Sequence, residues 1–243
     1  MSSTNNNIVA LNPEHHRDIR IKSELIEQHG SQLHLVPAVL SEFIKLAVHY
    51  PIVITKNSQT GQFMCSAMLG LSQGENLFWQ ADKWNAVYVP LQVRRQPFFV
   101  GQEKEEGADK ARFVLCIDEN SPAISQTEGQ ALFDDAGEET EFFKNSRSII
   151  SEILQGEPLT RDFLTHLERL DLIEAISLDI TLANQQQMKI NGLYTISQDK
   201  LADLDAEQLK QLQTKGYLGP AYCLAHSVAQ IYALIDRKNQ QLT

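Results

Sequence analysis

Short apolar runs bounded by turn-forming residues predict β-strands in the first half of the chain. Residues 51–55 and 62–71 flank a polar, glycine-containing stretch at 57–61, and this order predicts an antiparallel hairpin. Further strands are expected at residues 86–89 and 112–117, where apolar side chains again form short runs.

Two other segments of the first half have different patterns. Residues 37–50 carry apolar side chains at helical spacing and are followed by Pro51, so a helix is expected there. Residues 101–109 are charged and flanked by glycines, which predicts a surface loop between strands.

Helical spacing dominates the second half of the chain. Residues 138–154 begin with acidic side chains, which favour a helix N-terminus, and carry an apolar stripe. Thr160 is expected to cap a separate helix that follows. The remaining expected elements are a hairpin and two helices: residues 177–181 with 188–196, the helix that Asp205 caps and Gly216 ends, and residues 220–236.

These elements predict an α+β protein. Its N-terminal half (residues 8–134) is expected to be β-rich, with antiparallel hairpins, and its C-terminal half (residues 135–240) to be mainly helical and packed against it. No linker rich in glycine, proline or serine separates the halves, so a single domain over residues 1–243 is expected.

Charge is unevenly distributed along the chain, whose formal net charge is −10. Residues 1–100 hold 8 basic and 7 acidic side chains, whereas the remaining residues hold 13 basic and 24 acidic ones. The acidic second half would repel a phosphate backbone, so nucleic acid is not an expected partner. An anionic ligand is expected to bind the first half, although solubility alone also explains an acidic surface.

Composition also predicts the compartment. The N-terminus has neither a basic start nor an apolar core of a signal peptide, and no uncharged run approaches the length of a membrane helix. The three cysteines, Cys65, Cys116 and Cys223, are odd in number and widely separated. We therefore expect a cytoplasmic protein with three free thiols and no membrane insertion.

The densest aromatic segment of the chain, residues 74–99, is the predicted ligand site. We call it the aromatic–arginine run because it holds both tryptophans and an arginine pair. Aromatic rings offer faces for stacking, and guanidinium groups bind carboxylate or phosphate oxygens in pairs. The residues predicted to bind a ligand are Glu75, Asn76, Trp84, Tyr88, Arg94 and Arg95.

Structural roles compete with that interpretation at each position. The aromatic rings also suit a buried core cluster, and Asn76 also suits a turn after Gly74. If Arg94 and Arg95 lie on a strand, only one of them faces a given pocket, and either can form a structural ion pair.

Motifs of familiar enzymes and metal sites are missing from the sequence. The histidines lack chelating spacing, and Cys116 lies in an apolar strand that favours a buried, inert thiol. Glycine-rich phosphate loops and the hydrolase nucleophile elbow are also missing. We therefore expect no metal and no cofactor, and no catalytic residue is assigned.

Motifs spread over most of the chain resemble those of the bacterial SapC family. The order and spacing are most specific within the aromatic–arginine run. One departure lies at residues 81–83, where a glycine is expected before Trp84. The motifs are LN at 11–12, YPIV at 50–53, LGL at 69–71, GENLF at 74–78, Trp84, YVP at 88–90, RR at 94–95, PF at 97–98, CID at 116–118, LFD at 132–134 and GLY at 192–194.

The resemblance implies a bacterial protein of a family named for an association with surface layers, and it implies no reaction. The leading hypothesis is a non-catalytic binding or accessory protein of a bacterial pathway that recognises a peptide, an amino-acid-like ligand or a partner protein. One alternative is an uncharacterised enzyme with a site near Trp84 and Arg95. Another is a cytoplasmic component of surface-layer or export machinery.

Overall fold

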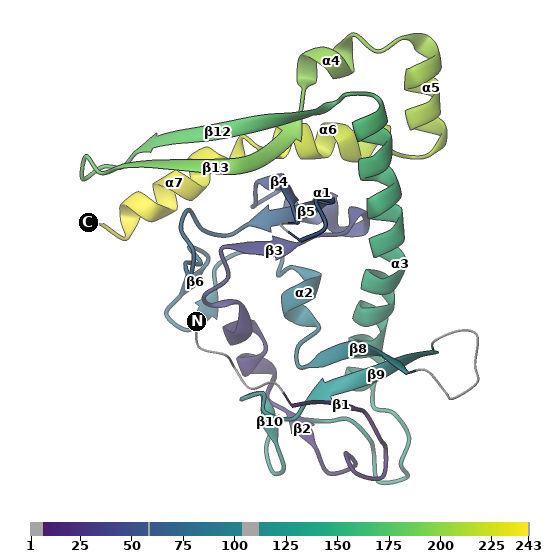
Figure 1. Cartoon of the computed structure of the whole chain (residues 1–243). Helices are drawn as coiled ribbons and strands as arrows, with labels where there is room; N and C mark the ends of the chain where they lie inside the picture. The colour runs from purple at the N-terminus through teal and green to yellow at the C-terminus, as the bar shows by residue number, and fades with distance from the viewer. Residues whose placement is uncertain (1–6, 58, 104–111, 243) are drawn as a thin grey trace. The chain divides into compact units, whose positions relative to one another are not determined.

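The computed structural model describes residues 7–57, 59–103 and 112–242 (Figure 1). The chain forms two compact units. We call Met1–Gly30 with Leu91–Ile153 the first unit, and Ser31–Pro90 with Leu154–Thr243 the second unit.

Antiparallel sheets lie mostly in the N-terminal half of the chain, and most of the helical residues, including a helix of 29 residues, lie in the C-terminal half. The predicted α+β class is therefore confirmed.

The first unit contains two small antiparallel sheets. In one, β9 lies between β1 and β8, and in the other β2 lies between β10 and β11. Phe98 of β8 packs against Phe143, which also contacts Phe133, and these rings form part of the core. The elements of this unit are β1 (Ile8–Ala10), β2 (Arg20–Ile21), two 3₁₀ turns (Ser23–Leu25 and Glu27–Gly30), α2 (Leu91–Arg94), β8 (Phe98–Glu103), β9 (Arg112–Asp118), β10 (Ile124–Ser125), β11 (Gln130–Ala131) and the start of α3 (Glu141–Arg169).

A five-stranded antiparallel sheet forms the centre of the second unit. Its order is β12, β13, β4, β5 and β3, so a hairpin from late in the chain joins strands from its first half. The apolar side chains Ile52, Val53 and Ile54 of β4 are fully buried, as expected for a strand covered on both faces. The strand bounds are β3 (Leu35–Pro37), β4 (Ile52–Lys56), β5 (Phe63–Met68), β12 (Ile173–Thr181) and β13 (Gln187–Ile196).

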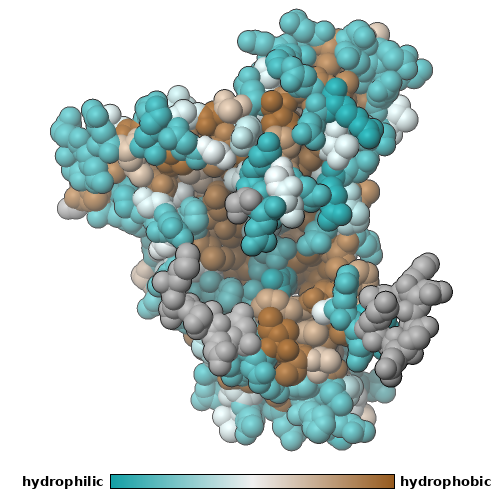
Figure 2. Space-filling view, in the orientation of Figure 1, coloured by the Kyte–Doolittle hydropathy of each residue, from teal (hydrophilic) through white to brown (hydrophobic). Residues whose placement is uncertain are grey.

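Both predicted hairpins are confirmed. β4 pairs with β5 from Ile52 opposite Ala67 to Lys56 opposite Phe63, and Gly61 has the positive φ of 69° that the connecting turn needs. β12 pairs with β13 over most of its length, and α7 (Gln230–Gln240) lies along this ribbon (Figure 1). Figure 2 shows that hydrophilic side chains cover the tip of the ribbon.

Helices follow the ribbon in the second unit. Asp205 caps α5 as predicted, because its side chain accepts a hydrogen bond from the backbone N–H of Gln208 at 2.8 Å. Gly216, with a φ of 74°, lies just beyond the end of this helix. The helices are α1 (Phe43–Leu46, after a 3₁₀ turn at Leu40–Glu42), α4 (Gln198–Ala202), α5 (Ala206–Thr214), α6 (Leu218–Ser227), α7 and the end of α3.

Helix α3 corrects the expectation of two separate helices. It continues from Glu141 to Arg169 without a break, and Pro158 lies inside it. Thr160 does not cap a helix: its hydroxyl donates to the carbonyl of Gly156 at 2.7 Å, one turn earlier. Phe163, Leu164 and Leu167 are buried. Their packing stabilises the helix beyond the proline.

Four further expectations are wrong in whole or in part. Residues 86–89 form no strand; the carbonyl of Tyr88 instead accepts a hydrogen bond from the Tyr50 hydroxyl. The expected helix at 220–236 divides into α6 and α7, and the buried Ser227 hydroxyl at the end of α6 accepts a hydrogen bond from the backbone N–H of Ile52. The expected helix at 37–50 is shorter in the structure, where it consists of a 3₁₀ turn and α1.

The surface loop expected at residues 101–109 is replaced in part by a strand. Residues 101–103 belong to β8, and residues 104–109 lie outside the described residues.

The residues before Trp84, where a glycine was expected, form a tight turn. β6 (Trp79–Gln80) pairs with β7 (Lys83–Trp84), so only Ala81 and Asp82 connect these strands. Both have left-handed backbones, with φ of 49° and 58°. Two-residue hairpin turns of this kind favour glycine, and the chain adopts the turn without it.

One described helical stretch has the length and composition of a membrane span. Residues Leu218–Gln240, which comprise α6 and α7, reach a mean hydropathy of 1.2 in their most apolar window, of which 33% is buried. This corrects the expectation that no run approaches that length. Core helices of soluble proteins meet the same criterion, so the finding alone assigns no membrane location.

Candidate functional site

The aromatic–arginine run is shared by the two units. Residues up to Pro90 belong to the second unit, and residues from Leu91 onward belong to the first. Four predicted ligand-binding residues, Glu75, Asn76, Trp84 and Tyr88, therefore lie in one unit, and the arginine pair lies in the other. Each group is described within its own unit.

Trp84 and Tyr88 belong to a hydrogen-bonded aromatic cluster. Trp84 Nε1 donates to Tyr50 Oη at 2.7 Å, and Tyr50 Oη donates to the Tyr88 carbonyl at 2.5 Å. The Tyr88 hydroxyl donates to Glu42 Oε2 at 3.1 Å. Tyr50, Trp84 and Glu42 are buried, so these polar groups satisfy one another inside the fold. The sequence interpretation missed Tyr50 and Glu42, which lie more than 30 positions away from their partners.

Glu75 and Asn76 hold the backbone of their own loop. Glu75 accepts from the backbone N–H of Leu71 at 2.9 Å and pairs with Lys238 of α7 at 2.5 Å. Asn76 Oδ1 accepts from the backbone N–H of Phe78 at 2.8 Å, as a turn-forming asparagine does. The polar atoms of both side chains are thus engaged within the protein.

The arginine pair does not lie on a strand. Arg94 ends the short helix α2 and is exposed, and Arg95 follows it. Arg95 donates from Nε to Gln92 and from Nη1 to the carbonyl of Phe98, both at 2.6 Å. Its guanidinium also stacks 4.3 Å from the centre of the Phe99 ring. Burial and the charge of Arg95 together lower the pKa of His29, against the opposing effect of Asp118.

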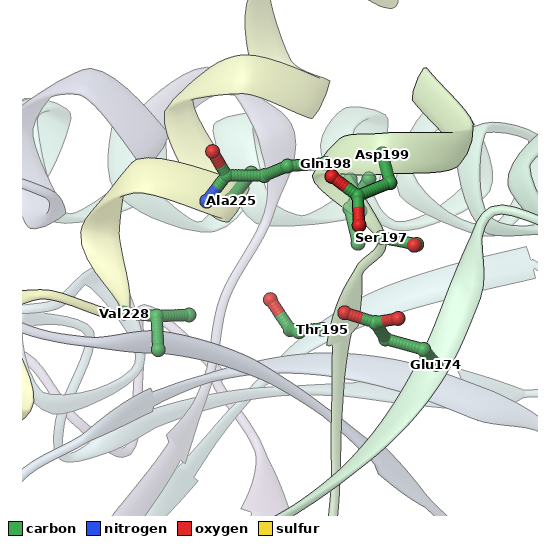
Figure 3. A pocket seen from close by; sticks show the side chains of 8 residues that line it. Glu174, Thr195, Ser197, Gln198, Asp199, Ala225 and Val228 are labelled. Atoms are coloured by element: carbon green, nitrogen blue, oxygen red, sulfur yellow. The ribbon is translucent and has the colours of Figure 1, made fainter. Parts of the chain in front are cut away.

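A hollow of about 180 Å³ lies in the second unit, between the β12–β13 ribbon, the start of α4 and α6 (Figure 3). We call it the β13–α4 hollow. It has room for about six water molecules, at roughly 30 Å³ each. None of the six predicted ligand-binding residues lines it. Its polar side chains come from Glu174, Thr195, Ser197, Gln198 and Asp199, and Ala225 of α6 and Val228 just beyond that helix complete the lining with Ile196.

Thr195 is the unusual residue of this hollow. It is only 6% exposed, yet its hydroxyl oxygen has no hydrogen-bond partner in the structure. Figure 3 shows this oxygen directed into the space bounded by Val228, Gln198 and Asp199. A buried hydroxyl without a partner destabilises a protein by about 1–3 kcal/mol, so such groups are uncommon. Thr195 is therefore positioned to bond something that occupies the hollow.

The charged side chains that line the hollow are both acidic. Figure 3 shows the carboxylates of Glu174, from β12, and Asp199, from α4, on the same side of Thr195, with Val228 on the other. The lining contains no lysine, arginine or histidine. The hollow therefore combines negative charge, one free hydroxyl and a small apolar wall.

The first unit has its own polar hollow, of about 310 Å³, near Arg17, Arg20 and Asp135. Arg17 donates to the Asp135 carbonyl at 2.8 Å, and Arg20 donates to the Gly129 carbonyl at 3.3 Å. Its charged side chains are exposed and of both signs, so it selects no ligand class. Among the residues that the structure describes, no group of three histidine, cysteine or acidic side chains is arranged to hold a metal ion.

Sequence analysis missed the β13–α4 hollow because its residues have ordinary local roles. Thr195 occupies a regular strand position, and Ser197 precedes a short helix. The one available signal was a run of polar side chains, residues 197–200, directly after an apolar strand. The hollow is also lined by Ala225 of α6 (Leu218–Ser227), a helix that comes later in the chain.

The comparisons with known proteins identify the family and nothing more specific. The model of the SapC family matches residues 11–234. No curated protein and no solved structure matches the chain. The match spans most of the chain and includes every side chain described above at the β13–α4 hollow and in the aromatic–arginine run. The chain therefore belongs to the SapC family.

Proposed function

We propose that this protein is a non-catalytic binding or accessory protein of a bacterial pathway, and that its ligand occupies the β13–α4 hollow. The proposal keeps the class of function that the sequence favours. It moves the site from the aromatic–arginine run to the second unit's sheet and helices.

The observation that supports the proposal is the Thr195 hydroxyl, buried without a partner and directed into an open space. Folding gains nothing from such a group, since valine would fill the same volume without burying an unpaired hydroxyl. A ligand that bonds the hydroxyl supplies the missing partner. A binding role thus explains a residue that stability alone does not.

Binding explains the hollow better than catalysis does. A threonine nucleophile needs a base within hydrogen-bond reach, and the Thr195 hydroxyl has no hydrogen-bond partner. The volume also sets the size of the ligand, because drug-sized ligands occupy pockets of about 300–1,000 Å³. A small molecule, or one terminal group of a larger one, fits about 180 Å³.

The aromatic–arginine run has a supporting role in this proposal. The contacts of Trp84, Tyr88 and Glu75 tie the loop before Pro90 to Tyr50 and to α7. An anionic ligand beside Arg94 or Arg95 stays a prediction. Loss of binding in Arg94→Ala with an unchanged melting temperature would support that prediction.

A thermal-shift screen of small polar metabolites on the wild-type protein and on Thr195→Val tests the proposal. We expect at least one compound to raise the wild-type melting temperature, because a ligand that binds only the folded state stabilises it. The same compound should have little effect on Thr195→Val. Hits that stabilise both proteins equally would place the ligand elsewhere and overturn the assignment of the site.

A further inference from the structure

The chemistry of the β13–α4 hollow favours a positively charged ligand. Its charged side chains, Glu174 and Asp199, are both carboxylates, and no cationic side chain lines the space. Both carboxylates are exposed, and a bound cation would pair with their negative charge. An anionic or zwitterionic ligand would bring a further carboxylate or phosphate to a site without a cation to pair with it.

We infer that the β13–α4 hollow binds a small aliphatic amine in its protonated form. The inference rests on the proposed function, which says only that some ligand occupies the hollow. The inferred cationic ligand differs from the anionic ligand that the sequence predicts. Among the amino-acid-like ligands of the leading hypothesis, it retains only those with an ammonium group and no carboxylate.

An alkylammonium ion matches the groups around the hollow. It has three N–H donors and no acceptor. Thr195, Glu174 and Asp199 offer three side-chain acceptors, of which the Thr195 hydroxyl is otherwise unpartnered. Ala225 of α6 and Val228, just beyond its end, provide an apolar wall for a short alkyl chain. Charge-assisted hydrogen bonds are stronger than neutral ones, so the ammonium form is selected over an alcohol of the same shape.

A metal cation would also neutralise the two carboxylates, but it fits the hollow less well than an organic cation. The two carboxylates alone give too few ligands for a divalent ion, and the described residues contain no group of three acidic, histidine or cysteine side chains able to hold one. The apolar wall also has no role in binding a bare ion. An organic cation uses both features of the site.

Calorimetric titration with three isosteric probes tests the inference: n-butylamine, n-butanol and butyrate. The titrations use phosphate buffer at pH 7.5, because Tris is itself an amine and would compete. A primary alkylamine is protonated at this pH, as a lysine side chain is. We expect n-butylamine to bind saturably with one site per chain, and n-butanol and butyrate to bind at least tenfold more weakly.

Isosteric variants assign the binding to the hollow. Glu174→Gln and Asp199→Asn each remove one charge and keep the shape of the side chain, and each should weaken n-butylamine binding by about tenfold. Asp179→Asn is the matched control, because Asp179 lies on the same strand as Glu174 but outside the hollow and pairs with Lys189. It should bind n-butylamine like the wild type.

Each outcome decides the inference. Equal affinity for n-butanol and n-butylamine would overturn the amine assignment and leave the proposed binding function standing. Absence of saturable n-butylamine binding would also overturn it, and the metabolite screen would then decide the proposed function independently. If Asp179→Asn weakens n-butylamine binding as much as Glu174→Gln does, the binding depends only on general surface charge. That result would contradict the assignment of the site to the hollow.

Discussion

Two buried threonines of the second unit differ in one respect, and that difference defines the site at the residue scale. Thr160 and Thr195 are each 6% exposed. Thr160 donates to the carbonyl of Gly156 and accepts from the backbone N–H of Leu40 at 3.0 Å, whereas Thr195 has no hydrogen-bond partner. Thr160 thus stabilises the fold, and Thr195 is available to a ligand.

Replacing each threonine by isosteric valine separates the two roles. Thr195→Val should raise the free energy of unfolding by about 1 kcal/mol, because it removes an unpaired buried hydroxyl. Thr160→Val should lower it by about 1–3 kcal/mol, because it leaves the Leu40 N–H without its partner. Urea denaturation of both variants measures the difference. Equal destabilisation would mean that Thr195 has a structural partner in solution.

Tyr217 and Asp162 form a hydrogen-bonded pair that makes stability depend on pH. The Tyr217 hydroxyl donates to Asp162 Oδ2 at 2.6 Å. Burial, together with this bond, raises the pKa of Tyr217 to about 12. The same bond is the main cause that lowers the pKa of Asp162.

Tyr217→Phe should reduce this pH dependence, although Lys215 and His166 also lower the pKa of Asp162. The stability that Tyr217 contributes is fully present below pH 10, its ordinary pKa, and is lost as pH rises towards 12, because the unfolded phenol ionises first. On the acid side, the contribution of Asp162 is lost as pH falls below its ordinary pKa of 3.8. Urea unfolding of both proteins at pH 3, 8 and 11 should show the largest difference at pH 8. A constant difference would contradict the pairing.

Helix α3 shows at the element scale how packing overrides a local signal. Gly156 and Pro158 would each weaken an isolated helix, yet α3 continues through both. Gly156 has a specific reason to be small: a Cβ placed there would lie 2.8 Å from Val39 Cβ. The helix backbone therefore packs directly against the segment that leads into α1.

Alanine at two helical glycines tests this close packing. Gly156→Ala should lower the free energy of unfolding by about 1–2 kcal/mol, because overpacking outweighs the helix propensity of alanine. Gly219→Ala in α6, where nothing lies within 4 Å, should raise it by about 0.5 kcal/mol. Thermal unfolding of the two variants measures both signs. Stabilisation by Gly156→Ala would show that Val39 does not contact α3.

Local chemistry explains which elements could be predicted from the sequence. The hairpins β4–β5 and β12–β13 were predictable because polar turns separate apolar strands, and α5 was predictable from its Asp205 cap. The expected break near Thr160 was wrong because burial of Phe163 and Leu167 stabilises the helix. The expected strand at 86–89 was wrong because Tyr50, far away in the sequence, bonds the Tyr88 carbonyl.

The site was less predictable than the elements. The aromatic–arginine run stood out by composition, but the partners of its polar groups, such as Lys238 for Glu75, lie up to 163 residues away. The β13–α4 hollow is assembled from β12, β13, α4 and α6, and no sequence pattern shows that Thr195 lacks a partner there. The sequence shows which residue types are present. It does not show whether their hydrogen-bonding groups already have partners within the fold.

At the scale of the whole molecule, the three cysteines are free and differ in accessibility. Cys65 and Cys116 are buried, and Cys223 is half-buried. Burial raises the pKa of the Cys65 and Cys223 thiols, which lowers their thiolate fraction at neutral pH.

Thiol titration tests this state and bears on the predicted cytoplasmic location. In the unreduced native protein, Cys223 should react first with a thiol reagent, and the two buried cysteines should react slowly. Urea should then expose all three thiols. A titration that finds only one thiol in urea would indicate a disulfide and contradict the prediction of a reducing compartment.

The family match covers parts of both units, so an account of the protein's function has to hold for the intact chain. We propose that the β13–α4 hollow is a ligand site completed by the Thr195 hydroxyl, and a crystal structure of the full chain soaked in n-butylamine tests this proposal. We predict density for the amine in the hollow, with its nitrogen within hydrogen-bond distance of Thr195 Oγ1 and at least one of the carboxylates of Glu174 and Asp199. A hollow that holds only water, or a Thr195 hydroxyl bonded to another protein group, would contradict the claim.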